Sequence, residues 1–95
     1  MEINIELFTV CFTVYTESDK NLHTEVKTFG NWNDARALFN QYCWQAHLEA
    51  LFGENWDEEN KNDSYRYDME EKQDKDEYTA HSDAYEGFHV NVKFC

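Results

Sequence analysis

Phe88-His89-Val90-Asn91-Val92-Lys93-Phe94, near the end of the sequence, is the stretch that decides the fold. Large apolar residues occupy every second position of this stretch, and polar residues occupy the positions between them. Because successive side chains of a strand point to opposite faces, this alternation predicts a strand with one face on a core and the other in water. The fold therefore contains a half-buried β-sheet.

Two strands are predicted near the start of the chain. Residues 3–15 are rich in β-branched and aromatic side chains, and their main alternation places Phe8, Val10, Phe12 and Val14 on one face. The apolar residues at positions 3, 5 and 7 follow the opposite phase, which predicts a bulge or an apolar second face near Leu7 and Phe8. A second strand over residues 22–29 follows a polar turn over residues 17–21, so the two strands should form a hairpin.

A long helix is predicted after this hairpin. Asn31 or Asn33 can cap its first turn, and Gly53 is a natural stop after Phe52. Residues at three- and four-residue spacing form one apolar stripe that should cover the sheet: Ala35, Leu38, Phe39, Tyr42, Cys43, Ala46 and Ala50.

The second half of this helix is also apolar on the opposite side, where Trp44, Leu48 and Leu51 lie. One helix face cannot pack both sets of residues against the same sheet. Either the segment after Gly53 folds back over this side or another molecule covers it. These three residues are therefore the candidate oligomer interface.

The second half of the chain predicts two or three further strands. Tyr65, Tyr67 and Met69 alternate with charged residues and predict a short strand. Residues 77–84 predict another strand, and residues 83–87 predict a turn before the final strand. The chain has no proline and no visible linker. We therefore expect a single α+β domain over residues 1–95, with an antiparallel sheet of four to five strands and one main helix on one face.

The cysteines and the apolar segments bear on the cellular compartment. Cys11, Cys43 and Cys95 are odd in number and widely spaced, which predicts free thiols, two of them packed as small apolar groups. No basic segment followed by an apolar segment opens the chain, and no apolar run is long enough to cross a bilayer. These features predict a cytoplasmic protein.

The charge balance is strongly acidic, with 20 Asp and Glu against 8 Lys and Arg and a net charge of −12. More than half of the acidic residues lie between Glu54 and Glu77. Anionic lipid and bare nucleic acid would repel such a surface, so neither is expected to bind directly. A compact domain that tolerates this self-repulsion is expected to have an electropositive protein partner.

The patterns that could bind metal ions are incomplete. Asp57, Glu59 and Asp63 lie at alternate positions as calcium-loop ligands do, but Lys61 occupies a ligand position and Asn62 stands where the loop needs glycine. Cys43 and His47 are four residues apart on the helix, without a second pair of ligands for zinc. The sequence therefore predicts no metal site and no cofactor.

The patterns that could support catalysis are equally weak. His81, Ser82 and Asp83 are consecutive, so on a strand their side chains alternate between faces and cannot form a relay. With only 3 glycines, the chain has no glycine-rich loop for phosphate. We expect no catalytic residues and no enzymatic activity.

The acidic tract has two interpretations. Charge runs commonly form solvated surfaces. Alternatively, carboxylates on a strand, about 6.7 Å apart at alternate positions, could occupy the phosphate sites of a nucleic-acid-binding groove, with aromatic residues as anchors. The candidate partner-binding residues are Trp56, Asp57, Glu58, Glu59, Tyr65, Tyr67, Asp68, Glu70, Glu71, Asp74, Asp76 and Glu77.

In its size, in its carboxylate run with Trp56, Tyr65 and Tyr67, and in its ββα…ββ order, the chain resembles small acidic inhibitors that phages make against host defence nucleases, above all anti-CRISPR proteins. The resemblance extends over the whole chain and assigns no role to individual residues. It implies a non-enzymatic protein of the host cytoplasm that binds a CRISPR–Cas effector and blocks the engagement of target DNA or guide.

Two other functions remain open from the residues. The same electrostatics would suit an immunity protein or antitoxin that neutralises a toxic nuclease. A small assembly protein that forms a homodimer through Trp44, Leu48 and Leu51 is the alternative from a different class.

Overall fold

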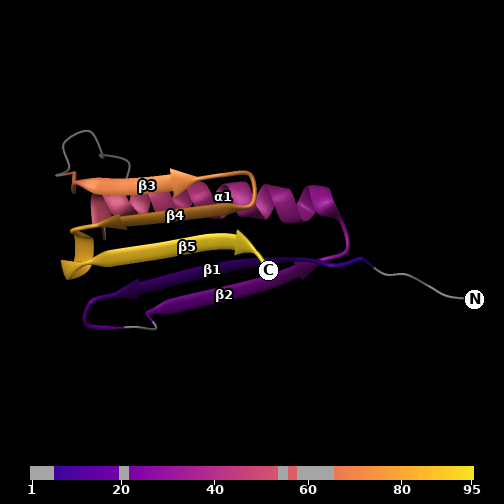
Figure 1. Ribbon diagram of the computed structural model, residues 1–95, viewed down its shortest axis with the longest axis horizontal. Coiled ribbons are helices and arrows are strands. Elements are labelled where there is room, and N and C mark those ends of the chain that lie inside the picture. The colour runs from indigo at the N-terminus through magenta and orange to yellow at the C-terminus, as the bar shows by residue number, and fades with distance from the viewer. Residues whose placement is uncertain (1–5, 20–21, 54–55, 58–65) are drawn as a thin grey trace, which may run out of the picture.

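The computed structural model describes residues 6–19, 22–53, 56–57 and 66–95. These residues form one antiparallel sheet of five strands, in the spatial order β2-β1-β5-β4-β3, with one long helix against one face (Figure 1). The elements in chain order are β1 (Phe8–Thr16), β2 (His23–Phe29), α1 (Trp32–Phe52), β3 (Met69–Gln73), β4 (Glu77–Ser82), the short 3₁₀ helix η3 (Ala84–Glu86) and β5 (Phe88–Phe94). The predicted α+β architecture is confirmed.

The core lies between the helix and the middle of the sheet. β1 and β5 are adjacent, and their register pairs Phe12 with Val92 and Val14 with Val90, four side chains that are all buried. The polar residues between them face the opposite side of the sheet. The strand phases predicted from the alternation are therefore correct.

The helix begins and ends where its sequence predicts. The Asn31 Oδ1 accepts hydrogen bonds from the backbone N–H groups of Asn33 (2.7 Å) and Asp34 (3.3 Å), which caps the first turn. Gly53 follows the last turn with φ +62°. The predicted apolar stripe faces the sheet, and all its members but the half-buried Leu38 are buried. Its three alanines, each 0% exposed, allow the helix to approach the strands closely.

The limits of three predicted strands differ in the structure. β1 begins at Phe8 and pairs continuously with β2 from that residue, so the first of the two alternatives near Leu7 and Phe8, a bulge, is wrong. Leu7 precedes the strand and is 60% exposed. β3 begins at Met69 rather than near Tyr65, which lies outside the described residues. The Tyr67 N–H donates instead to the Leu51 carbonyl at 2.8 Å, which ties this segment to the helix end. β4 ends at Ser82, two residues early.

The prediction of three free thiols is wrong for two of the cysteines. Cys11 and Cys95 form a disulfide, with their Cα atoms 6.4 Å apart. The β1–β5 register pairs Cys11 with Lys93, and the Cys95 N–H donates to the Thr9 carbonyl at 2.9 Å, so the last residue returns to β1. Cys43 is a buried free thiol, as predicted, and burial raises its pKa to about 11.

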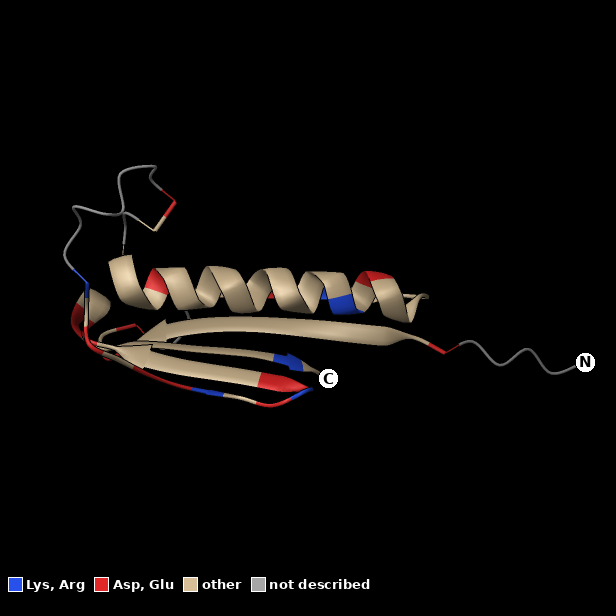
Figure 2. Cartoon of the chain, turned by 90° about the horizontal axis from the view of Figure 1, so that it is seen from above, with Lys and Arg blue, Asp and Glu red and all other residues tan. Residues whose placement is uncertain are grey.

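The sheet is covered on one face. Figure 2 shows α1 along this face, and no described element lies over the other. We call the uncovered side the open face; polar side chains of β1, β5 and β4 such as Thr13, Asn91 and Thr79 belong to it. Within the described part of the chain, no helix is both long enough and apolar enough to span a membrane.

Candidate functional site

The strand register gathers three rings and a carboxylate into a row across the open face. Tyr15 pairs with His89, His89 with His81, and His81 with Glu70. The Tyr15 and His89 rings are stacked, with centroids 4.8 Å apart and planes 6° apart, and the His81 ring lies 5.7 Å from His89. The His81 Nε2 is 3.1 Å from the Glu70 Oε2. We call these four residues the ring row.

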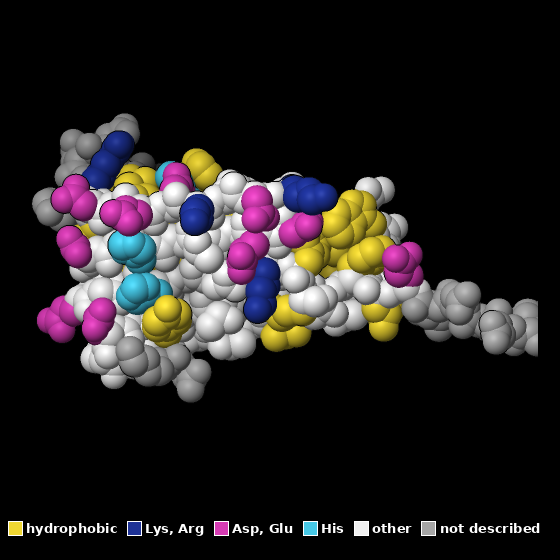
Figure 3. Space-filling model, in the orientation of Figure 1, with side chains coloured by type: hydrophobic (Ala, Val, Ile, Leu, Met, Phe, Trp, Pro, Cys, Tyr) yellow, Lys and Arg dark blue, Asp and Glu magenta, His cyan; other side chains and the backbone are white. Residues whose placement is uncertain are grey.

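The ring row forms part of a shallow groove on the open face. The groove has a volume of about 500 Å³, and Lys72, Thr79 and Asn91 line it beside the rings. Figure 3 shows this face, with histidine side chains next to each other and acidic side chains around them at one end as well as farther along the surface. The groove therefore combines flat apolar surface with hydrogen-bonding groups of both charges.

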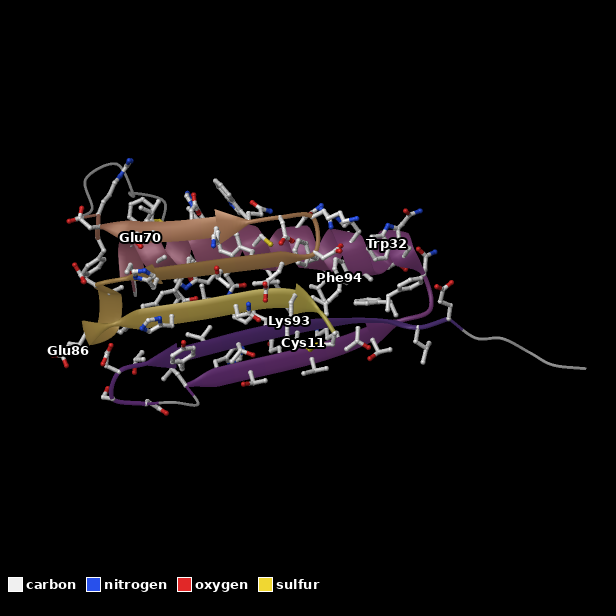
Figure 4. All side chains as sticks on the ribbon, in the orientation of Figure 1. Cys11, Trp32, Glu70, Glu86, Lys93 and Phe94 are labelled. Carbon is white, nitrogen blue, oxygen red and sulfur yellow. A yellow bond between two sulfur atoms is a disulfide. The ribbon has the colours of Figure 1, made fainter. Side chains whose placement is uncertain are left out.

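Acidic residues from three separate segments converge at one end of the sheet. Because neighbouring strands are antiparallel, the end of β1, the start of β5, the end of β4 and the start of β3 lie together, as the pairs Thr16–Phe88 and Met69–Ser82 record. The exposed carboxylates at this end include those of Glu17, Asp68, Glu70, Asp83 and Glu86. We call these five residues the acidic end; Glu70 and Glu86 mark it in Figure 4.

The turn that carries Glu86 has an unusual backbone. Tyr85 and Glu86 both have positive φ values, 52° and 61°, and Gly87 follows with φ +111°. A left-handed conformation costs a non-glycine residue roughly 1–2 kcal/mol. A side chain at position 87 would also clash with Glu17, whose N–H donates to the Gly87 carbonyl at 3.2 Å. The turn thus holds Glu17 and Glu86 near each other at the cost of backbone strain, which is typical of functional sites.

Two histidines connect the ring row to the acidic end. His81 lies 3.1 Å from Glu70, and the His89 Nε2 lies 3.9 Å from the Glu17 Oε1. Both carboxylates stay exposed, with 83% of the Glu70 side chain and 71% of the Glu17 side chain accessible. Both can therefore contact another molecule without the loss of a buried bond.

Several residues of the predicted acidic tract stabilise the β3–β4 hairpin instead. The Glu71 Oε2 accepts hydrogen bonds from the Tyr78 hydroxyl (2.6 Å) and the His47 Nδ1 (2.9 Å) on the helix side of the sheet. These bonds, above all the one from Tyr78, lower the pKa of the Glu71 carboxyl although burial opposes them. The Asp74 Oδ1 accepts from the N–H groups of Asp76 (2.8 Å) and Glu77 (2.9 Å).

The regular array of carboxylates predicted for this tract is therefore wrong within the described residues. Glu70 and Glu71 point to opposite faces of β3, and Lys72 is the next residue on the Glu70 face. Asp74 and Asp76 lie in the turn between β3 and β4, at the end of the sheet away from Glu70. The Glu77 Oε2 accepts from the Asn91 Nδ2 at 2.9 Å on the open face.

The other predicted contact residues are scattered. Glu58, Glu59 and Tyr65 lie outside the described residues. Trp56 is half-buried and Asp57 exposed just after the helix. Tyr67 packs against the core with its ring beside Gly53. Only Asp68 and Glu70 of the predicted set belong to the acidic end.

The predicted oligomer residues lie on the far side of the helix from the core. The Trp44 side chain is 64% exposed and stacks on the His47 ring, with centroids 5.7 Å apart. Leu48 and Leu51 are half-buried. No described segment covers Trp44, and most of the segment after Gly53, which the sequence offered as one possible cover, lies outside the described residues.

Sequence reasoning missed Tyr15, His81, His89, Glu17, Asp83 and Glu86. A signal was present, because His81 and His89 occupy polar positions of two successive predicted strands. Recognising the site also required the strand order, because β1 and β5 are neighbours in the sheet although they are far apart in sequence. Among the described residues, no three His, Cys, Asp or Glu side chains are arranged to hold a metal ion.

Comparison with protein-family models, curated proteins and solved structures found no match to this chain. The geometry of the open face and the acidic end is therefore the basis for a functional assignment.

Proposed function

We propose that this protein is a non-enzymatic inhibitor that binds a cationic surface of a nucleic-acid-binding protein through its acidic end. The convergence of five exposed carboxylates from three segments is the observation that carries the proposal. A site of this kind accelerates the encounter with a positively charged groove and competes there with nucleic acid.

The ring row supplies the contact area that carboxylates alone lack. Flat aromatic rings contribute much of the energy at protein interfaces, whereas exposed rim charges act mainly on the association rate. Tyr15, His89 and His81 form such a surface directly beside Glu70 and Glu17. The partner is therefore expected to bind across the corner between the acidic end and the open face.

We propose a CRISPR–Cas effector as the target class and the cytoplasm as the place of action. The resemblance of the chain to anti-CRISPR proteins and its net charge of −12 support this choice. In the cytoplasm, Cys11 and Cys95 would be held as neighbouring thiols, because that compartment keeps cysteines reduced.

The test measures binding to purified, guide-loaded effectors by bio-layer interferometry over a series of salt concentrations. The test variant carries Glu70→Lys and Glu86→Lys at the acidic end. The control carries Glu6→Lys and Asp76→Lys, two exposed residues at the opposite end of the sheet, with the same change in net charge. We expect the test variant to associate at least about tenfold more slowly and with a flatter salt dependence than the control.

Binding of no effector would contradict the proposed target class. Equal association rates for the two variants would contradict the proposed surface, because they differ only in where the charge was changed. A parallel assay of target-DNA binding by the effector shows whether the complex is inhibited at the step that the proposal requires.

A further inference from the structure

β2 is an edge strand whose outer side has no partner among the described residues (Figure 1). It is seven residues long, and Val26 at its centre is 57% exposed on the open face. An edge strand of this length presents unpaired backbone N–H and C=O groups to any other strand. The edge can therefore accept a further strand in antiparallel alignment.

The sequence of β2 is complementary to itself. In His23-Thr24-Glu25-Val26-Lys27-Thr28-Phe29, the residues on the two sides of Val26 match when a second copy runs antiparallel. Val26 then faces Val26, and Thr24 faces Thr28. Glu25 faces Lys27 twice, once on each side of the centre, and opposite charges directly across two strands are stabilising.

The charges also select this register over its neighbours. In a symmetric pair of β2 strands, the two-fold axis is perpendicular to the sheet, so each residue stays on its own face. Any other register of the two strands therefore moves the axis from Val26 to another residue of β2. Centring on Glu25 places this carboxylate against itself, and centring on Lys27 does the same for two ammonium groups. Centring on Thr24 or Thr28 leaves much of the strand unpaired.

The two charged residues are available at the edge. The Tyr42 hydroxyl donates to the Glu25 Oε2 at 2.6 Å, and the His23 Nε2 lies 3.6 Å from the Glu25 Oε1. The Glu25 side chain is still 41% exposed. Burial, reinforced by this bond, raises the pKa of Tyr42 to about 12, so the hydroxyl remains a donor at neutral pH. Lys27 is exposed, and no carboxylate of the described residues pairs with it.

The remainder of the fold is compatible with this pairing. α1 packs chiefly over β1, β4 and β5, so the helices of two copies would stand apart on the same face. The antiparallel arrangement sends the two acidic ends in opposite directions, because each lies beyond the His23 end of its own β2. Repulsion between two chains of net charge −12 is thereby reduced.

The other edge of the sheet lacks this complementarity. β3 has five residues, Met69-Glu70-Glu71-Lys72-Gln73, and an antiparallel copy centred on Glu71 would place that carboxylate against itself. The Glu71 carboxylate is already bonded to Tyr78 and His47. Its charges protect β3 against pairing.

We propose that the protein forms a symmetric homodimer by antiparallel pairing of β2 with β2 of a second copy, centred on Val26. The two sheets then continue as one. The interface is separate from the helix surface of Trp44 and from the acidic end.

Sedimentation velocity over a range of protein concentrations tests the proposal with a charge swap. In Lys27→Glu, two Glu–Glu pairs replace the two Glu–Lys pairs, and we expect dimerisation to weaken at least about tenfold. The double variant Glu25→Lys/Lys27→Glu exchanges the charges and should recover most of the lost affinity. Lys72→Glu on β3 is the matched control and should behave as the unmodified protein.

Circular dichroism of each variant checks that it is folded. If the double variant does not fold because Glu25→Lys removes the Tyr42 bond, the comparison of Lys27→Glu with the unmodified protein tests the dimer by itself. A protein that is monomeric at all concentrations would overturn the proposal. So would a dimer that Lys27→Glu leaves intact or that Leu48→Asp dissociates. Failure of the folded double variant to recover affinity would refute the register.

Discussion

The Tyr78 hydroxyl donates a 2.6 Å hydrogen bond to the Glu71 carboxylate across the β3–β4 hairpin. His47 of α1 binds the same carboxylate oxygen at 2.9 Å, so one residue of the acidic tract connects the helix to the edge of the sheet. Glu71 therefore stabilises the fold, whereas its neighbour Glu70 faces water at the acidic end.

This bond predicts a defined response to acid. The pKa of Glu71 is lowered from its usual value of 4.5, chiefly by the Tyr78 hydroxyl. A carboxyl group whose pKa is lower in the folded than in the unfolded protein stabilises the folded state at pH values above its unfolded-state pKa. This contribution is lost as the pH falls through the lower, folded-state pKa. Urea unfolding at a series of pH values below about 5 should show a smaller loss of stability for Glu71→Gln than for the unmodified protein.

Glu6→Gln, at an exposed position before β1, is the control for this measurement. It should follow the unmodified protein over the whole series. Identical acid profiles for Glu71→Gln and Glu6→Gln would show that the Tyr78 bond does not stabilise the folded state.

The disulfide predicts a large stability difference between the oxidised and reduced protein. Cys11 and Cys95 are 84 residues apart in sequence, so their bond restricts the unfolded chain strongly. Cys95→Ser should lower the free energy of unfolding by about 2–4 kcal/mol, and chemical reduction of the unmodified protein should have the same effect. Peptide mapping without reductant should recover the Cys11 and Cys95 peptides as one species; two separate peptides would contradict the pairing.

Cys43 should react slowly with alkylating agents while the protein is folded. Burial raises its pKa to about 11, so little thiolate is present at neutral pH. We expect labelling of the Cys11→Ser/Cys95→Ser variant to be slow in buffer and fast in denaturant. Rapid labelling under native conditions would mean that α1 does not pack on the sheet as described.

The turn before β5 should be sensitive to substitution of its glycine. Gly87→Ala should reduce stability by about 1–3 kcal/mol, because φ is +111° and the new side chain would clash with Glu17. Gly30→Ala is the matched control, since a Cβ at that position would meet no atom within 4 Å. Thermal unfolding of both variants compares the two sites, and equal losses would exclude the strained turn as the cause.

Much of the fold could be predicted because its signals are local. The alternation of Phe12 and Val14 in one strand and of Val90 and Val92 in another identifies the buried face without knowledge of their pairing. The cap at Asn31 and the stop at Gly53 depend on neighbouring residues alone.

The candidate site could not be predicted in the same way, because the strand order creates it. Glu17 and Gly87, which follows Glu86, are far apart in sequence and contact each other only because β1 and β5 are neighbours. The same order brings Cys95 to Cys11. The acidic tract misled the prediction because consecutive strand residues such as Glu70 and Glu71 point to opposite faces.

The central proposal is that the acidic end binds the partner. Carboxyl footprinting of the protein alone and in complex with its effector tests this most directly. Carbodiimide labelling followed by mass spectrometry should show Glu17, Asp68, Glu70, Asp83 and Glu86 protected in the complex, while Asp34 and Asp76 remain equally reactive. Protection of Asp34 and Asp76, with the five residues still labelled, would contradict the proposed binding surface.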